Sequence, residues 1–235
     1  MLADVCRTFG RVTVVAPDRE QSGASHALTL NRPIRAERHP DGAYQVDGTP
    51  TDCVLLALGD LLADKPDVVV SGINHGPNMG EDVLYSGTVA AAMEGLSLGI
   101  PGIAISFAGN RVEREAHLAG QREWLIRVLK GATSRKDFPR DTLLNINLPP
   151  IPAGLIKGIR VTTLGRRVFS DSLSETFDPW NRRMYWIGGG QVSWSGREDS
   201  DFRAVQEGCI SVTPLHVDLT NYGLLEDVRS WRLGE

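Results

Sequence analysis

The chain has 235 residues, of which 41% are hydrophobic and 23% charged, and its formal net charge is −4. At roughly 150 residues per domain, this length suits one large domain, and the apolar fraction is sufficient for a packed core. A globally disordered chain is therefore excluded. The mild acidity argues against a general nucleic-acid binder, because a phosphate backbone attracts clusters of Lys and Arg.

Membrane insertion and export are not indicated either. No window of about 18 apolar residues occurs, and the first residues lack the basic and apolar regions of a signal peptide. The three cysteines, Cys6, Cys53 and Cys209, form no CxxC pair. We therefore expect reduced thiols in a cytoplasmic protein, without a disulfide framework or a zinc knuckle.

The first 150 residues alternate predicted helices and strands. Leu2, Val5, Cys6 and Phe9 have helical spacing, and Thr49-Pro50 is a strong helix start. We expect helices over residues 2–9, 49–62, 88–98 and 113–130, and strands over residues 11–16, 28–36, 43–46, 67–71, 102–107 and 141–148. The run at 67–71 is apolar without alternation, which suits a strand covered on both faces. This order predicts a parallel α/β sheet with right-handed crossovers.

The pattern changes after Pro150. Strands are expected over residues 158–163, 183–187 and 209–213, with an irregular region rich in Gly, Arg and Trp between them. A short helix over residues 225–231 ends the chain. We predict one domain over residues 1–235, made of an α/β core (1–150) and an extension (151–235).

Two polar loops follow predicted strands, over residues 16–25 and 71–82. Ligands of open α/β sheets bind at the carboxyl ends of the strands, so both loops are candidates for a functional site. Ordinary long turns use the same Gly, Asn and Asp residues. His75 lies in the second loop, where a single histidine is more often solvated than catalytic.

The apolar helix that follows opens with Ser86-Gly87-Thr88. Free N–H groups and the positive end of the dipole make such a helix start suitable for phosphate, and Gly87 would let an anion come close. The alternative is that Ser86 only caps the helix. At residues 49–52 the purely structural cap is the preferred interpretation.

Other sites are less supported. The chain contains no HExxH, GxSxG, GxGxxG or Walker A pattern. His39, His117 and His216 have no companion at ligand spacing. Trp180, Trp186 and Trp194 lie among arginines, which would suit base stacking, but packing or a subunit contact is the preferred explanation.

Five segments in order resemble the SurE (stationary-phase survival) nucleotidase family. They are VVAPDR at 14–19 with SGAS at 22–25, GTPTDC at 48–53, SGIN at 71–74 with GPN at 76–78, YSGTVAAAMEG at 85–95, and SVTPLHVDL at 211–219. The resemblance covers nearly the whole chain. It implies a Rossmann-like, mostly parallel α/β fold with a β-rich C-terminal extension that exchanges elements between subunits, in a homodimer or homotetramer.

The resemblance also implies a metal-dependent phosphomonoesterase that acts on nucleoside monophosphates, some members also cleaving short polyphosphate. By this resemblance Ser22 and Asn74 help to hold one divalent cation per subunit, Mg²⁺ or Mn²⁺. Asn78, Ser86, Gly87 and Thr88 contact the phosphate. Neither a membrane nor a nucleic acid is an expected partner.

One family feature does not occur in this sequence. The family opens with a strand and an Asn-Asp-Asp-Gly loop, whose two aspartates are the main metal ligands, and this sequence begins in the helix after that loop. The catalytic residues are therefore unassigned, since the expected aspartate pair falls before Met1. We expect the complete gene product to include that segment. The alternative is a shortened, catalytically inactive protein that binds nucleotide or phosphate.

Overall fold

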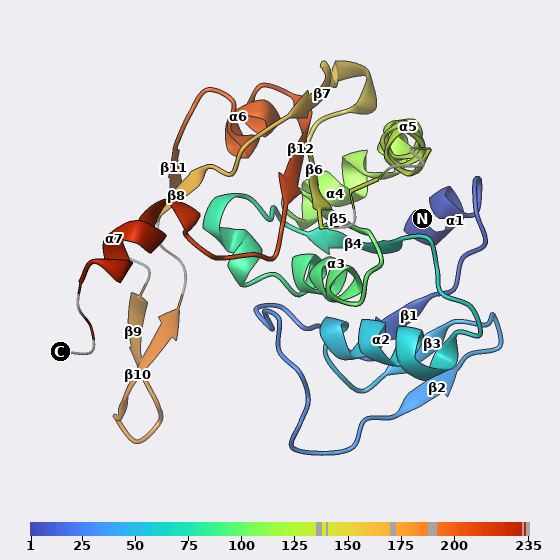
Figure 1. The fold of residues 1–235 in the computed structure, drawn as a ribbon, viewed down its shortest axis with the longest axis horizontal. Coiled ribbons are helices and arrows are strands. Elements are labelled where there is room, and N and C mark those ends of the chain that lie inside the picture. Colours follow the sequence, from blue (N-terminus) through green and yellow to red (C-terminus); the bar gives the residue numbers. More distant parts are fainter. Residues whose placement is uncertain (135–137, 140, 170–172, 188–191, 232, 234–235) are drawn as a thin grey trace.

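The computed structural model describes residues 1–134, 138–139, 141–169, 173–187, 192–231 and 233. Its strands form a three-stranded sheet, a five-stranded sheet and two separate antiparallel pairs, the hairpin β9–β10 and the pair β8–β11. In Figure 1 the three-stranded sheet, with α2 against it, stands apart from the five-stranded sheet. The α/β class predicted from the sequence is confirmed, and the core strands before Pro150 are divided between two sheets.

The elements of the first part have these bounds: α1 Leu2–Cys6, β1 Val15–Pro17, β2 Ala36–Arg38, β3 Tyr44–Val46, α2 Pro50–Leu56 with a π-helical continuation Ala57–Leu61, β4 Val69–His75, a 3₁₀ turn Gly80–Leu84, α3 Gly87–Ser97, β5 Gly102–Phe107, α4 Arg111–His117, α5 Arg122–Thr133 and β6 Leu143–Leu148. Those of the second part are β7 Gly158–Val161, β8 Arg166–Phe169, β9 Leu173–Phe177, β10 Arg183–Ile187, β11 Val192–Ser195, α6 Asp201–Gln206, β12 Cys209–Leu215 and α7 Leu225–Arg229.

The five-stranded sheet has the order β4-β5-β6-β12-β7 and holds the main core. Strands β4, β5 and β6 are parallel, whereas β12 runs antiparallel to β6 and parallel to β7. Ile103, Ile105 and Phe107 of β5 are fully buried on one face of the sheet, in a cluster with α1 and α5. Ala104 packs with α3 on the other face. Helices therefore cover both faces of the parallel part.

Most predicted elements of the first part are confirmed, and β5 has the predicted bounds. Three differ. Only the last two residues of the run 11–16 lie in a strand, β1, the expected helix at 113–130 is divided into α4 and α5, and the segment 28–35 contains no strand. The run at 67–71 is covered on both faces as predicted, since Val70 packs against the main core and a Cβ on Gly95 of α3 would lie 2.7 Å from Val69 Cγ2. However, β4 is only half-buried. The reason is that β4 is an edge strand, paired among the described residues with β5 alone.

The second part is more regular than the sequence suggested. Strands β8, β9 and β11 and helix α6 occur where an irregular region was expected. The sequence signal for these strands was weak because, in the part of the chain that the structure describes, β9 and β10 pair only with each other and are mostly exposed. No buried face therefore imposes an alternation of apolar residues. No helix in the described part of the chain is long and apolar enough to cross a membrane.

Candidate active site

A cleft of about 1840 Å³ lies between the two sheets. Its walls include residues 12–17 leading into and along β1, residues 68–75 of β4, and the start of α3. The edge of β1 away from β3 and the edge of β4 away from β5 have no strand partner among the described residues. The cleft therefore reaches the carboxyl end of β4, the location at which α/β sheets bind their ligands.

A β-bulge decides which side chains of β4 reach this site. Ser71 is opposite Ala104 on β5, but Asn74 is opposite Ser106, so β4 contains one extra residue between these pairs. Gly72 permits the irregularity, because its φ is +133° and a Cβ there would lie 2.4 Å from the Ile105 carbonyl oxygen. Without the bulge, Ile73 would occupy the position of Asn74.

Asn74 links β4 to the start of α3. Its amide Nδ2 donates to the carbonyl oxygens of Gly76 at 3.0 Å and His75 at 3.3 Å. Its Oδ1 receives only a long contact of 3.4 Å from the Thr88 hydroxyl. The structure thus brings Asn74 and Thr88 together. The family resemblance implies that Asn74 holds the cation and that Thr88 contacts the phosphate of the same site. The prediction placed Asn74 and His75 in a loop, whereas both end β4.

Loop 18–26 is attached to the same helix start. The Ser25 N–H donates to the Tyr85 carbonyl at 3.1 Å, and its hydroxyl donates to the Leu84 carbonyl at 2.6 Å. His26 Nε2 lies 2.8 Å from the Glu94 carboxylate of α3. Ser22 lines the cleft and donates to Glu20 Oε1 at 2.7 Å. These contacts hold Ser22 in a loop that is fixed to α3.

The start of α3 combines a cap with free donors. Ser86 Oγ accepts the Val89 N–H at 3.1 Å, so Ser86 is the N-cap, and its own hydroxyl hydrogen stays available to a ligand. A Cβ on Gly87 would lie 3.0 Å from Pro50 Cγ and 3.5 Å from the Gln21 carbonyl oxygen. The absence of a side chain at Gly87 therefore allows α2 and loop 18–26 to approach α3 closely.

Asn78 is almost fully buried, yet it lines the cleft. Its backbone N–H donates to Asn147 Oδ1 at 2.9 Å, and its carbonyl accepts from the amides of Asn145 and Asn147 at 2.8 and 3.0 Å. Its side-chain Nδ2 donates to Ser106 Oγ at 2.7 Å. The parallel sheet thus holds Asn78 through side chains of β5 and β6.

The second part of the chain fixes the 3₁₀ turn between Asn78 and Ser86. Asp201 is fully buried and accepts the N–H groups of Gly80 and Gly165, each at 2.9 Å. Burial raises the pKa of Asp201, and the hydrogen bonds from Gly80, Gly165 and Phe202 oppose that shift. Arg167, which also lines the cleft, forms an ion pair with Asp82. The Arg167 N–H donates to Glu81, which lowers the pKa of that carboxyl.

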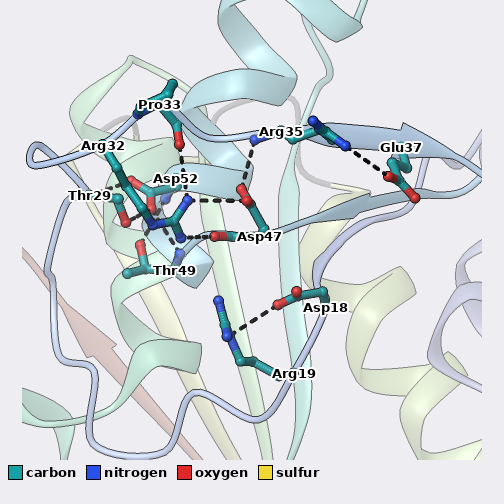
Figure 2. A network of polar contacts seen from close by, with 10 residues as sticks. All are labelled: Asp18, Arg19, Thr29, Arg32, Pro33, Arg35, Glu37, Asp47, Thr49 and Asp52. Carbon is teal, nitrogen blue, oxygen red and sulfur yellow. Dashed lines mark hydrogen bonds and ion pairs between the residues drawn. The ribbon is translucent and has the colours of Figure 1, made fainter.

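A polar network holds the segment that follows loop 18–26 (Figure 2). Asp52 completes a capping box with Thr49 at the start of α2, and it also accepts the N–H and hydroxyl of Thr29 at 3.0 and 2.6 Å. Burial acts to raise the pKa of Asp52, but these hydrogen bonds outweigh it and the pKa is lowered. The structural interpretation of residues 49–52 is confirmed.

The six predicted site residues, Ser22, Asn74, Asn78, Ser86, Gly87 and Thr88, all line this one cleft. The sequence reasoning missed Ser106, Asn145, Asn147, Arg167 and Asp201. The sequence did contain a signal for Asn145 and Asn147. Apolar and amide side chains alternate over residues 144–148, which form a strand, so both amides lie on one face of the sheet. Arg167 and Asp201 have no comparable local pattern.

The model of the family "Survival protein SurE" matches residues 1–171. The chain belongs to the SurE family. It is 59% identical over 231 residues to a 5'-nucleotidase SurE of Gemmatimonas aurantiaca, and 47% identical over 230 residues to that of Pelobacter propionicus. Each match covers 98% of this chain and 92% of the relative.

A solved structure agrees with the family assignment. The crystal structure of a SurE protein from Aquifex aeolicus matches with a TM-score of 0.83 and 40% sequence identity. The match covers 97% of this chain and 92% of that chain. The fold expected from the family resemblance, an α/β core with a strand-rich extension, is therefore confirmed.

The chemistry of the cleft fits part of a site for a hard cation. Since Nδ2 of Asn74 is engaged with carbonyls, its Oδ1 is the atom left for a ligand, and the Ser22 hydroxyl adds a second neutral oxygen. Such oxygens suit Mg²⁺ or Mn²⁺, which also favour anionic ligands. In the described residues no three His, Cys, Asp or Glu side chains gather as a metal site.

Proposed function

We propose that this protein is a metal-dependent phosphomonoesterase that hydrolyses nucleoside monophosphates to a nucleoside and inorganic phosphate. The observation that carries the proposal is the contact between Asn74 and Thr88, which joins the candidate cation residue to the candidate phosphate residues in one cleft. The 59% identity to a 5'-nucleotidase SurE supports an enzyme rather than an inactive phosphate-binding protein.

The start of α3 would bind the phosphate group. Its first N–H groups and the hydroxyls of Ser86 and Thr88 are donors, and the helix dipole favours the negative charge of the phosphate. Asn78 would add its side-chain amide from the wall of the cleft. These groups orient the phosphorus atom and stabilise the charge that develops on its oxygens during hydrolysis.

Ser22 and Asn74 would serve as neutral oxygen ligands of one divalent cation per subunit. When bound, Mg²⁺ or Mn²⁺ supplies Lewis acidity that withdraws charge from the phosphoryl oxygens. Loop 18–26 would keep Ser22 near Asn74, because Ser25 and His26 attach that loop to the turn before α3 and to α3 itself. A cytoplasmic location stays a prediction.

We also propose that the protein assembles as a homodimer or homotetramer through the β9–β10 hairpin. This hairpin extends away from the body of the chain in Figure 1 and exposes large apolar side chains. Ile187 is 90% exposed, and Trp186 and Leu173 are also largely exposed. A second copy of the hairpin would bury this surface, which supports the exchange of elements implied by the family resemblance.

Phosphate release from 5'- and 3'-nucleoside monophosphates tests the proposed activity, with Mg²⁺ or Mn²⁺ titrated into the reaction. We expect release that requires the cation, and Asn74→Ala should raise the metal concentration needed for half-maximal rate. Asn110→Ala is the matched control, because Asn110 caps α4 and does not line the cleft. A folded wild-type chain that releases no phosphate from any of these substrates would contradict the proposal.

A further inference from the structure

A row of polar side chains crosses four strands of the buried sheet. Asn74 of β4 is opposite Ser106 of β5, Ser106 is opposite Asn147 of β6, and Asn147 is opposite Ser211 of β12. The last three of these residues are fully buried. Asn145 lies two residues before Asn147, on the same face, and is also fully buried. Polar side chains in the centre of a sheet are costly unless they are hydrogen-bonded.

Three of these residues converge on Asn78. Ser106, Asn145 and Asn147, which we call the Asn78 frame, together make four hydrogen bonds to Asn78, of 2.7 to 3.0 Å. They occupy both backbone polar groups of Asn78 and one hydrogen of its side-chain amide. Only its Oδ1 and its second amide hydrogen are left for a group in the cleft.

The stability of the sheet does not explain the frame. The side-chain amide of Asn145 donates a hydrogen bond to the Asn78 carbonyl, but the Asn145 Oδ1 is buried and has no hydrogen-bond partner in the described part of the chain. A buried acceptor without a partner destabilises the fold, and an apolar side chain of similar volume avoids that penalty. The frame is therefore better explained by the orientation that it imposes on Asn78.

We propose that Ser106, Asn145 and Asn147 are positioning residues that fix the Asn78 side chain at the phosphate end of the cleft. This inference rests on the proposed function, since it assigns the phosphate of the substrate as the ligand of Asn78. The frame acts only through Asn78 and does not touch the ligand. It also couples the phosphate site to the core, because every residue of β5 and all but one of β6 are buried.

A double-mutant cycle between Ser106 and Asn78 tests the proposal. Ser106→Ala removes the acceptor of the Asn78 amide with little change in volume, so the chain should fold. We expect its affinity for inorganic phosphate, measured by calorimetric titration with Mg²⁺ present, to fall about tenfold, the equivalent of losing one hydrogen bond. In an Asn78→Ala background, Ser106→Ala should cause no further loss, because the frame then has nothing to orient.

Thr213→Val is the matched control. Thr213 is buried on the neighbouring strand β12, opposite Asn145, and its hydroxyl pairs with that of Thr162 at 2.8 Å. This variant should lower the melting temperature as Ser106→Ala does and leave phosphate affinity unchanged. An equal loss of phosphate affinity in Thr213→Val, or additive losses in the cycle, would overturn the positioning role.

Other outcomes separate the inference from the proposed function. If the wild-type chain binds phosphate and releases it from nucleotides while Ser106→Ala retains full affinity, the frame is only structural and the proposed function stands. If the wild-type chain neither binds phosphate nor releases it, the proposed function fails and the inference fails with it. Asn147→Ala, which removes two of the four hydrogen bonds to Asn78, should reduce phosphate affinity more than Ser106→Ala does.

Discussion

The two hairpin strands β9 and β10 differ from β5 in what their side chains contact. Every residue of β5 is buried, whereas every residue of β10 is exposed. Both strands are rich in apolar side chains, as Gly-Ile-Ala-Ile-Ser-Phe and Arg-Met-Tyr-Trp-Ile show. The same kind of residue therefore stabilises the fold of one region and forms a surface in the other. The site is built next to β5, on β4 and the start of α3, and no described residue of β9 or β10 lines the cleft. Arg167 of β8 and Asp201 of α6, which flank the hairpin in the sequence, fix the turn before α3.

We expect the largest difference in the free energy of unfolding between substitutions of two phenylalanines that end strands. Phe107 ends β5 and is fully buried, and Phe177 ends β9 and is 54% exposed. Phe107→Ala should reduce the free energy of unfolding by about 3–5 kcal/mol, because it leaves a cavity in the core. Phe177→Ala should cost less than about 1 kcal/mol. Urea denaturation measures both, and similar losses for the two variants would show that the hairpin is part of the folding core.

Gly87→Val should have the next largest effect, at the junction of loop 18–26, α2 and α3. The new side chain would contact Pro50 and the Gln21 carbonyl, so the loop must move away from the helix start. We expect phosphate affinity to fall about tenfold, or 1.4 kcal/mol. Gly131→Val is the control, since a Cβ on Gly131 of α5 meets nothing within 4 Å. Unchanged phosphate binding in Gly87→Val would place the anion elsewhere.

Asp52→Ala should have a smaller, pH-dependent effect. It removes the capping box of α2 and the contacts to Thr29, which we expect to cost about 1 kcal/mol at pH 7. The folded-state pKa of Asp52 lies below its ordinary value of 3.8. The stabilisation is therefore present above pH 3.8 and is lost as the pH falls through the folded-state pKa.

Chemical denaturation of wild type and Asp52→Ala at pH 7 and pH 3 measures this change. The difference between the two proteins should narrow at the lower pH. Glu113→Ala, in the exposed capping box of α4, is the comparison and should cost less than Asp52→Ala. A difference that stays constant between the two pH values would show that the charge of Asp52 is not what stabilises the start of α2.

Ile187→Ser should have the smallest effect on folding. Ile187 is 90% exposed, so we expect a change in the free energy of unfolding within about 0.5 kcal/mol. If the β9–β10 hairpin joins subunits, the same substitution should shift the particle mass in sedimentation toward the monomer. Val112→Ser, at a 75% exposed position of α4, should leave the mass unchanged. A wild-type chain that sediments as a monomer would contradict the assembly role of the hairpin.

The sequence by itself determined the features that depend on local chemistry. The start of α2 at Thr49-Pro50, the bounds of β5 and β10, and the six residues that line the cleft could all be predicted from caps, apolar runs and the SurE motifs. These signals act over a few residues or within one motif. For Ser86 the sequence left two roles open, a phosphate contact and a helix cap, and the structure shows that Ser86 caps α3.

Only the tertiary structure decided the features that depend on strand pairing. Pairing between strands decides the bulge that puts Asn74 opposite Ser106, and it divides the strands between two sheets. It also places the three buried side chains that form hydrogen bonds with Asn78. The residues that meet at the bulge and at Asn78 are more than 25 positions apart in the sequence. Asp201 meets Gly80 across 121 residues. Hydrogen bonds of this kind leave no periodic pattern, because each partner is a single residue whose role depends on register rather than on its neighbours in the chain.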